Sequence, residues 1–214
     1  MPDDLNSVNI DPSQRGYHHG ALRDALIAAA LEVIAERGVD GFSLRETTRR
    51  AGVSPAAPGH HFRDARGLLT AGAAAAFRDF GDALAAAVAG GDREARIRAM
   101  GVAYVRFALA NRARFDLIWR KALIDDGDPD YQAAGDRAFL TLDRAVRGAE
   151  ASPPPDWNAA MAPSIAAWSI VHGFARLAAD GVFGAEPEAV EQAVAALLPR
   201  VLDHLDVQAA SPKA

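Results

Sequence analysis

The chain has 214 residues, half of them hydrophobic, a formal net charge of −5 at pH 7 and no cysteine. A chain without cysteine has no disulfide framework, thiolate metal site or cysteine nucleophile, and it suits a reducing compartment. No apolar run approaches the roughly 18 residues of a membrane helix, and the polar, acidic start is unlike a signal peptide. We therefore expect a cytoplasmic protein with no membrane partner.

The composition favours an all-α fold. Alanine is abundant and runs of β-branched residues are few, which suits closely packed helices better than a sheet. A chain of this length is large enough for a substantial hydrophobic core, either in one domain or in two. Residues 1–16 contain prolines, a glycine and acidic side chains, and we expect a flexible arm there.

The first predicted helix runs from about Ala21 to Arg37, with apolar residues at helical spacing and Gly38 directly after it. Two histidines, His18 and His19, precede it. Adjacent residues point in different directions on a helix, so this pair favours contact with solvent or phosphate over metal binding. We expect no metal site.

A helix-turn-helix pattern follows the first helix. Ser43 is a good N-cap for a helix from Leu44 to Ala51, and Glu46 three residues later completes a capping box. Gly52 can adopt the left-handed conformation that ends this helix and reverses the chain. Ser54 is then the N-cap of a second helix, which carries proline at its first position.

The second helix of such a pair is the one that enters the major groove of DNA, with its N-terminal residues facing base edges. The exposed candidates are Ser54, Ala56, Ala57, Gly59 and His60. From residue 42 to residue 69, five arginines oppose one glutamate and one aspartate, which gives +3 in a chain whose net charge is −5. This local reversal of sign is typical of a phosphate-binding surface, so double-stranded DNA is the expected partner.

The sequence around this motif resembles the DNA-binding domain of the TetR (tetracycline repressor) family of bacterial regulators. The resemblance rests on a long helix that ends in AERG, the run AGVSPAA, the pair HF and a Leu-Leu pair, over about residues 18–69. It implies an all-α homodimeric repressor with an N-terminal three-helix DNA-binding domain and a C-terminal helical bundle that binds a small molecule and thereby releases a palindromic operator. The expected division is 17–64 for the first domain, 65–206 for the second and 207–214 for a disordered tail.

The chain departs from the family at positions that usually contact phosphate. Pro58 and Gly59 stand where Leu-Tyr is usual, and Ala65 stands where a lysine is usual. Threonines stand at positions 47 and 48, where isoleucine or valine and then alanine are usual. Pro58 also removes a backbone hydrogen bond at the start of the second helix, so we expect that helix to be short or distorted.

The residues expected to face DNA fall into two groups. Those that match the family pattern are Ser43, Arg45, Ser54, Ala56 and His61, beside the core residue Phe62. Those inferred from their place on the second helix or from their charge are Ala57, Gly59, His60, Arg63 and Arg66. Phosphate contacts are expected to shift toward the two arginines and the histidines of this second group.

Apolar spacing and turn residues predict six helices in the rest of the chain. They cover about residues 66–88, 92–111, 114–124, 131–147, 157–181 and 187–205. The segment SPPPD, residues 152–156, cannot be helical through its prolines and predicts an exposed connection. By resemblance, the last two helices pair with their copies across a two-fold axis to form the dimer.

Aromatic residues in the second domain leave two alternatives open. At helical spacing such residues usually form core, yet mostly apolar walls with a few polar tips also suit a pocket for a hydrophobic ligand. The candidate pocket residues are Tyr104, Phe107, Phe115, Trp119, Phe139, Trp168 and His172. Trp168 and His172 belong to a W-x-x-x-H-G motif that resembles one C-terminal subgroup of the family. They share one helix face, either as a core pair in which His172 donates a hydrogen bond or as part of the pocket.

No pattern in the sequence indicates catalysis. The H-E-x-x-H and G-x-S-x-G motifs, the phosphate-binding glycine loop and the dinucleotide fingerprint are absent. Ser169 and His172 are three residues apart, but no acid is placed to orient the histidine. We expect a regulator that is not an enzyme and needs no cofactor. The alternative is a helical ligand-binding or scaffold protein with a degenerate DNA-binding head.

Overall fold

The computed structural model describes residues 12–88, 90–148, 151 and 157–204, with residues 12–19 as backbone only. Every regular element within these residues is a helix, which confirms the all-α prediction. The predicted proline-rich connection, 152–156, and the predicted tail, 207–214, lie outside the described residues.

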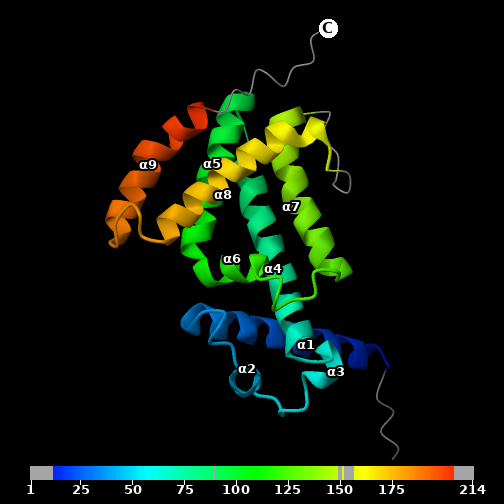
Figure 1. Cartoon of the computed structure of the whole chain (residues 1–214). Helices are drawn as coiled ribbons and strands as arrows, with labels where there is room; N and C mark the ends of the chain where they lie inside the picture. The colour runs from blue at the N-terminus through cyan, green and yellow to red at the C-terminus, as the bar shows by residue number, and fades with distance from the viewer. Residues whose placement is uncertain (1–11, 89, 149–150, 152–156, 205–214) are drawn as a thin grey trace, which may run out of the picture.

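Three helices form the N-terminal head at the base of Figure 1: α1 (Pro12–Arg37), α2 (Leu44–Arg50) and α3 (Gly59–Phe62). The apolar positions of α1 pack inward, and Leu26, Val33 and Ile34 are fully buried. Since α1 contacts α2 on one side and α4 on the other, it braces the helix-turn-helix against the rest of the molecule.

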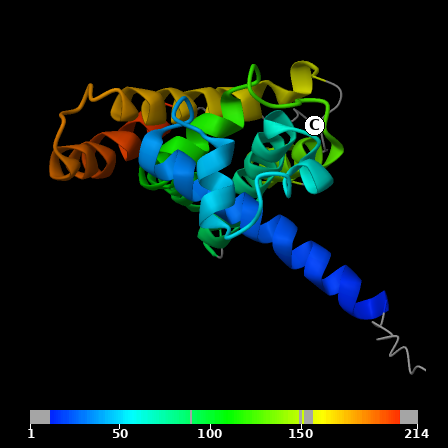
Figure 2. The same ribbon diagram turned by 90° about the horizontal axis from the view of Figure 1, so that it is seen from below.

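The helix α1 is longer than the sequence predicts. It begins at Pro12, so residues 12–16, which the sequence predicts to be part of a flexible arm, are helical, and residues 1–11 lie outside the described part of the chain. Proline suits the first turn of a helix because its missing N–H would be unpaired there. In Figure 2 the first turns of α1 project from the rest of the molecule.

The C-terminal body contains α4 (Ala65–Ala87), α5 (Arg93–Ala110), α6 (Arg112–Trp119), α7 (Pro129–Arg147), the short 3₁₀ helix η2 (Ala159–Met161), α8 (Ala162–Ala179) and α9 (Pro187–Asp203). Asp92 and Asp128 cap α5 and α7, since each carboxylate accepts a hydrogen bond from the N–H of the third residue of its helix. In the part of the chain that the structure describes, no helix combines the length and apolar character needed to cross a membrane.

Two helices of the body differ from their predicted spans. The helix α6 ends at Trp119 and not at Ile124, because the chain turns after Trp119 and buries the Ile124 side chain completely. The helix α8 begins at Ala162 and not at Trp157, because Asn158 caps a 3₁₀ turn that precedes it. Neither difference changes the order of the helices.

The long helix α4 runs from the head into the body and packs against α1, α5, α6 and α7 (Figure 1). Small residues allow its neighbours to approach closely. A Cβ atom at Gly72 would lie 3.5 Å from the Leu31 side chain of α1 and 3.6 Å from Leu117 of α6. Because α4 belongs to both the head and the body, a shift of this helix would move one against the other.

Candidate functional site

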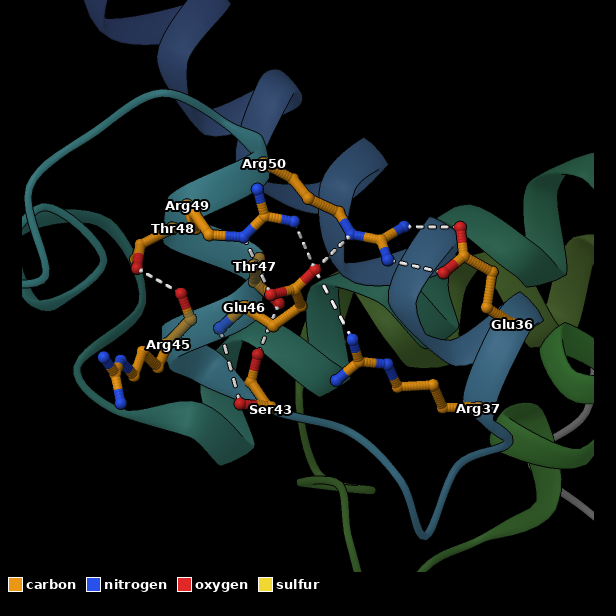
Figure 3. A network of polar contacts seen from close by, with 9 residues as sticks. All are labelled: Glu36, Arg37, Ser43, Arg45, Glu46, Thr47, Thr48, Arg49 and Arg50. Carbon is orange, nitrogen blue, oxygen red and sulfur yellow. Dashed lines mark hydrogen bonds and ion pairs between the residues drawn. The ribbon is translucent and has the colours of Figure 1, made fainter.

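The first helix of the helix-turn-helix begins as predicted. Ser43 has an extended backbone, and its Oγ accepts a hydrogen bond of 3.4 Å from the N–H of Glu46. The second half of the predicted capping box is wrong, because the Glu46 carboxylate faces three arginines and does not turn back toward Ser43 (Figure 3). Arginine competes well for a carboxylate because its hydrogen bonds are charge-assisted and form in pairs.

These arginines and two glutamates form a network that fastens α2 to α1. Arg49 donates to both carboxylate oxygens of Glu46, at 2.7 and 2.9 Å, and Arg50 donates to Glu46 at 3.0 Å. Arg50 also binds both oxygens of Glu36 on α1, at 2.7 and 2.5 Å. The hydrogen bonds from Arg49 and then Arg50 lower the pKa of Glu46 to about 2. Two of the five arginines that make this region positive are therefore already paired with acids.

Two threonines occupy α2 positions where the family usually has apolar residues. Thr47 and Thr48 are almost fully buried, with 0% and 2% of their surface exposed. Their hydroxyls donate to the carbonyls of Ser43 and Arg45, at 3.0 and 2.9 Å, within the helix itself. Since each hydroxyl is satisfied locally, threonine fits the core of the head without an unpaired polar group.

The turn between the two helices follows the prediction for Gly52. Its φ of +68° is in the left-handed region that glycine adopts without steric cost. The N–H of Gly52 donates to the Arg49 carbonyl and the N–H of Val53 donates to the Thr48 carbonyl, which together make a Schellman motif. Val53 is half-buried against the core of the head.

The recognition helix α3 is a single turn, as the prediction of a short or distorted helix requires. From Ala57 to His61 the backbone bonds reach back three residues, and the first four-residue bond runs from Phe62 to the Pro58 carbonyl, at 2.8 Å. Pro58 has no N–H to bond with the Ser54 carbonyl. The N-cap of α3 is Pro58, so the prediction that Ser54 caps this helix is wrong.

Most of the residues predicted to contact DNA lie on α2, on α3 and in the turns beside them, at the end of the head that faces away from the body (Figure 1), and Arg66 lies on the first turn of α4. Those that are exposed are Arg45, Ser54, Ala56, Gly59, His60, Arg63 and Arg66, and those that are half-buried are Ser43, Ala57 and His61. Arg45 points away from the Glu46 network (Figure 3). Among the described residues, no acid lies within ion-pair distance of Arg45 or Arg63.

The body contains a cavity of about 770 Å³ between α4, α5, α6, α7 and α8. Of the seven predicted pocket residues, those that line it are Tyr104, Trp119, Phe139, Trp168 and His172. Phe107 and Phe115, which were also predicted, do not line this cavity. Phe115 lies behind the wall, where its ring packs against Tyr104 and His172, and Phe107 packs against Phe80 at a centroid distance of 5.1 Å.

Tyr104 holds the polar edge of this cavity in place. Its hydroxyl lies 2.8 Å from Nδ1 of His172 and accepts a hydrogen bond of 3.1 Å from Nε1 of Trp168. Burial, followed by the charge of Arg176, lowers the pKa of His172. The tautomer of the His172 ring decides which of the two groups donates in the contact with Tyr104. Trp168 and His172 thus meet at a shared tyrosine while both line the cavity. The polar contact within the core and the position beside the cavity are thus found together, and a role in effector binding stays a prediction.

Sequence reasoning missed the polar residues that α7 contributes to the cavity beside Phe139. Gln132, Asp136 and Phe139 all line it, and they are spaced four and three residues apart. Residues at this spacing lie on one helix face, so the position of Phe139 could have indicated the two polar residues. The other missed residues include Lys121 and Asp126, which lie in the loop between α6 and α7.

The comparisons with known protein families agree with this arrangement of head and body. The tetR family of bacterial regulatory proteins matches residues 26–71, and the tetracyclin repressor-like C-terminal domain matches residues 97–201. The chain belongs to the TetR family. It is therefore a DNA-binding transcriptional regulator, as the resemblance of its helix-turn-helix implies. No curated protein sequence matches the chain.

Solved structures similar to this TetR-family chain cover both of its parts. A protein of unknown function from Rhodococcus sp. RHA1 is 37% identical, with a TM-score of 0.70. The match covers 88% of this chain and 97% of the Rhodococcus chain. The TetR family transcriptional regulator PfmR from Thermus thermophilus is 19% identical, with coverages of 85% and 98% and a TM-score of 0.60. A TetR family regulator from Marinobacter aquaeolei VT8 is 20% identical, with coverages of 88% and 97% and a TM-score of 0.57. The last two show a shared fold.

In this TetR-family protein, Arg66 joins the DNA-binding head to the loop that borders the cavity. Its guanidinium donates to the Ile124 carbonyl at 2.5 Å, so its predicted role as a phosphate contact competes with a bond inside the protein. Thr70 adds a second link, because its hydroxyl accepts from the N–H of Asp125 at 2.9 Å and donates to the Arg66 carbonyl at 2.8 Å. Arg120 of the same loop pairs with Asp40, which precedes α2.

Proposed function

We propose that this regulator is a homodimeric repressor that a small hydrophobic molecule releases from a palindromic operator. The observation that carries the proposal is the connection between the cavity and the head. Lys121 and Asp126 line the cavity, and the residues between them bond to the first turns of α4. A ligand that moves this loop would therefore move α4 and the head attached to it.

Exposed apolar residues on α8, on α9 and in the turn between them support the dimer, and we propose that they form one apolar face. Leu177 on α8 and Leu197 on α9 are 47% and 43% exposed, and Val182 in the turn after α8 is 61% exposed. Gly173 lies about one turn before Leu177 on α8, and a side chain there would meet open space. A small residue on an apolar face allows a second helix to approach closely. Two heads held about 34–36 Å apart would read successive major grooves.

The proposal is tested by selecting bound sequences from a random DNA pool and measuring the affinity for the selected operator. A neutral apolar probe, triphenylphosphine oxide, is then titrated into the protein alone and into its DNA complex. We expect the probe to weaken operator binding by the same factor by which the operator weakens probe binding, because linkage is reciprocal. A probe that binds the cavity and leaves the operator affinity unchanged would contradict release.

Arg45 and Arg63 are expected to supply phosphate contacts. Replacing both with alanine should weaken binding to every DNA sequence alike and lower the slope of log affinity against log salt by about 0.9 for each phosphate that is no longer neutralised. The matched control is Arg49→Ala, because Arg49 is exposed but already bonded to Glu46. Anisotropy titrations at several salt concentrations measure both quantities. An equal loss for Arg49→Ala would contradict this assignment.

A scaffold protein with a degenerate head is the competing function, and one observation favours it. The recognition helix is a single turn, and it carries glycine at its first position. The same titrations separate the two functions. A scaffold would bind the selected operator no better than random duplex and would show no salt dependence beyond that of random duplex.

A further inference from the structure

The walls of the cavity are aromatic and carry a net negative charge. Eight of the lining residues are phenylalanine, tyrosine or tryptophan, and all three tryptophans of the chain are among them. The charged lining residues are Lys121, Asp126 and Asp136, and His172 is neutral because burial lowers its pKa. One positive and two negative side chains give the lining a formal charge of −1.

Asp136 is the acid that this set leaves without a partner. The carboxylate of Asp126 lies 3.6 Å from Nζ of Lys121, so these two charges offset each other. The arginine next to Asp136 in the sequence, Arg137, pairs with Asp82 of α4 instead. Among the described residues, no cation lies within ion-pair distance of Asp136. Burial raises its pKa, so its charge is held in this cavity at a cost in free energy.

A positively charged ligand would offset that cost. The faces of aromatic rings are negative, and several rings around one site attract an organic cation, whereas they repel an anion of the same size. Tyr104, Trp119 and Trp168 supply such rings on the side of the cavity formed by α5, α6 and α8. Asp136 supplies a full negative charge from α7.

Building on the proposed function, we propose that the effector is a lipophilic organic cation, held with its positive charge facing Asp136 and its apolar groups against the aromatic walls. The proposal deepens the expectation of a merely hydrophobic ligand. It rests on the composition of the cavity and on the unpaired carboxylate, and it is independent of the DNA sequence that the head recognises.

The test compares three probes of similar shape on the full chain: tetraphenylphosphonium, a permanent cation; tetraphenylborate, an anion; and triphenylphosphine oxide, which is neutral. Binding is followed by the fluorescence of the three tryptophans, all of which line the cavity. We expect the phosphonium to bind at least about tenfold more tightly than the borate. Binding of the borate at equal or higher affinity, or no binding of the phosphonium, would overturn the proposal without any variant.

The Asp136→Asn variant isolates the carboxylate, because asparagine has almost the same shape and no charge. It should weaken phosphonium binding about tenfold and leave the binding of triphenylphosphine oxide unchanged. Asp130→Asn, on the exposed first turn of α7, is the matched control and should bind all three probes as the parent does. An unchanged preference for the phosphonium in Asp136→Asn overturns the role of this residue.

The outcomes separate this proposal from the proposed function. If triphenylphosphine oxide alone binds and releases operator DNA, the proposed function stands and the cationic ligand is excluded. If the phosphonium binds through Asp136 and the operator affinity does not change, the ligand class stands and release by a ligand fails. Operator affinity without any probe is measured in the same series, so loss of DNA binding is recognised independently.

Discussion

Replacing Leu197 with glutamate is expected to convert the proposed dimer into monomers and to weaken operator binding by a factor of about a hundred or more. Leu197 is 43% exposed near the middle of α9 and belongs to the apolar face proposed for the dimer, together with the exposed Leu177 of α8. Burial of a leucine contributes roughly 1.5–3 kcal/mol, and a two-fold interface loses that contribution twice. Two linked heads gain about 10²–10⁴ in avidity over one, and this gain disappears when the heads separate.

The measurement is sedimentation of the purified variant, followed by titration with operator DNA. Glutamate favours helix nearly as much as leucine does, so α9 itself should remain folded. The matched control is Ala133→Glu on an exposed face of α7, which adds the same charge away from the apolar face. A Leu197→Glu protein that remains dimeric and binds the operator normally would place the dimer interface elsewhere.

Leu197 is a better position for this test than Leu177. The helix α8 ends in a Schellman motif, in which the N–H of Val182 donates to the Leu177 carbonyl and Gly181 has a φ of +79°. Such motifs usually include a hydrophobic contact between these two positions. A change at Leu177 would therefore disturb the end of α8 as well as the apolar face.

The features that the sequence predicted well are those set by neighbouring residues. The N-cap at Ser43, the left-handed turn at Gly52 and the distortion at Pro58 each depend on residues within about four positions. The capping box failed for the opposite reason. The Glu46 carboxylate could bond either to the backbone of Ser43 or to nearby arginines. Arg50 lies close to Glu46 because it also bonds to Glu36, which is 14 residues from Arg50. Competition of this kind is decided by the packing of α1 on α2.

Long-range packing also explains the errors at the cavity and at Arg66. Phe115 and Trp119 lie one turn apart on α6, but only Trp119 lines the cavity, since the orientation of α6 depends on its contacts with α4 and α1. The carbonyl of Ile124 can accept from Arg66 because the helix ends at Trp119 and the loop then returns toward α4. No periodic pattern in the sequence indicates that the Ile124 carbonyl accepts a hydrogen bond from Arg66, which is 58 positions away.

The Asp143→Asn variant is expected to lose about 3–5 kcal/mol of stability. Asp143 is fully buried on α7, and its carboxylate accepts from Arg147, at 2.6 and 2.5 Å, and from the hydroxyl of Ser164 on α8, at 2.6 Å. Asparagine preserves the shape but takes the negative charge away from an arginine side chain that is only 7% exposed. Removing one partner of a buried ion pair costs much more than the pair contributed.

The matched control is Glu94→Gln, which removes the carboxylate from an ion pair with the same four-residue spacing on α5. Glu94 is exposed, and Arg98 keeps a second ion pair with Asp203, so the change in stability should be small in comparison. Urea unfolding at one fixed protein concentration measures both variants, since dimer stability depends on concentration. Adding Arg147→Met to Asp143→Asn removes the buried positive charge as well and should recover part of the loss. Equal losses in Asp143→Asn and Glu94→Gln, or no recovery in the double variant, would mean that the α7–α8 contact depends on packing and not on this buried pair.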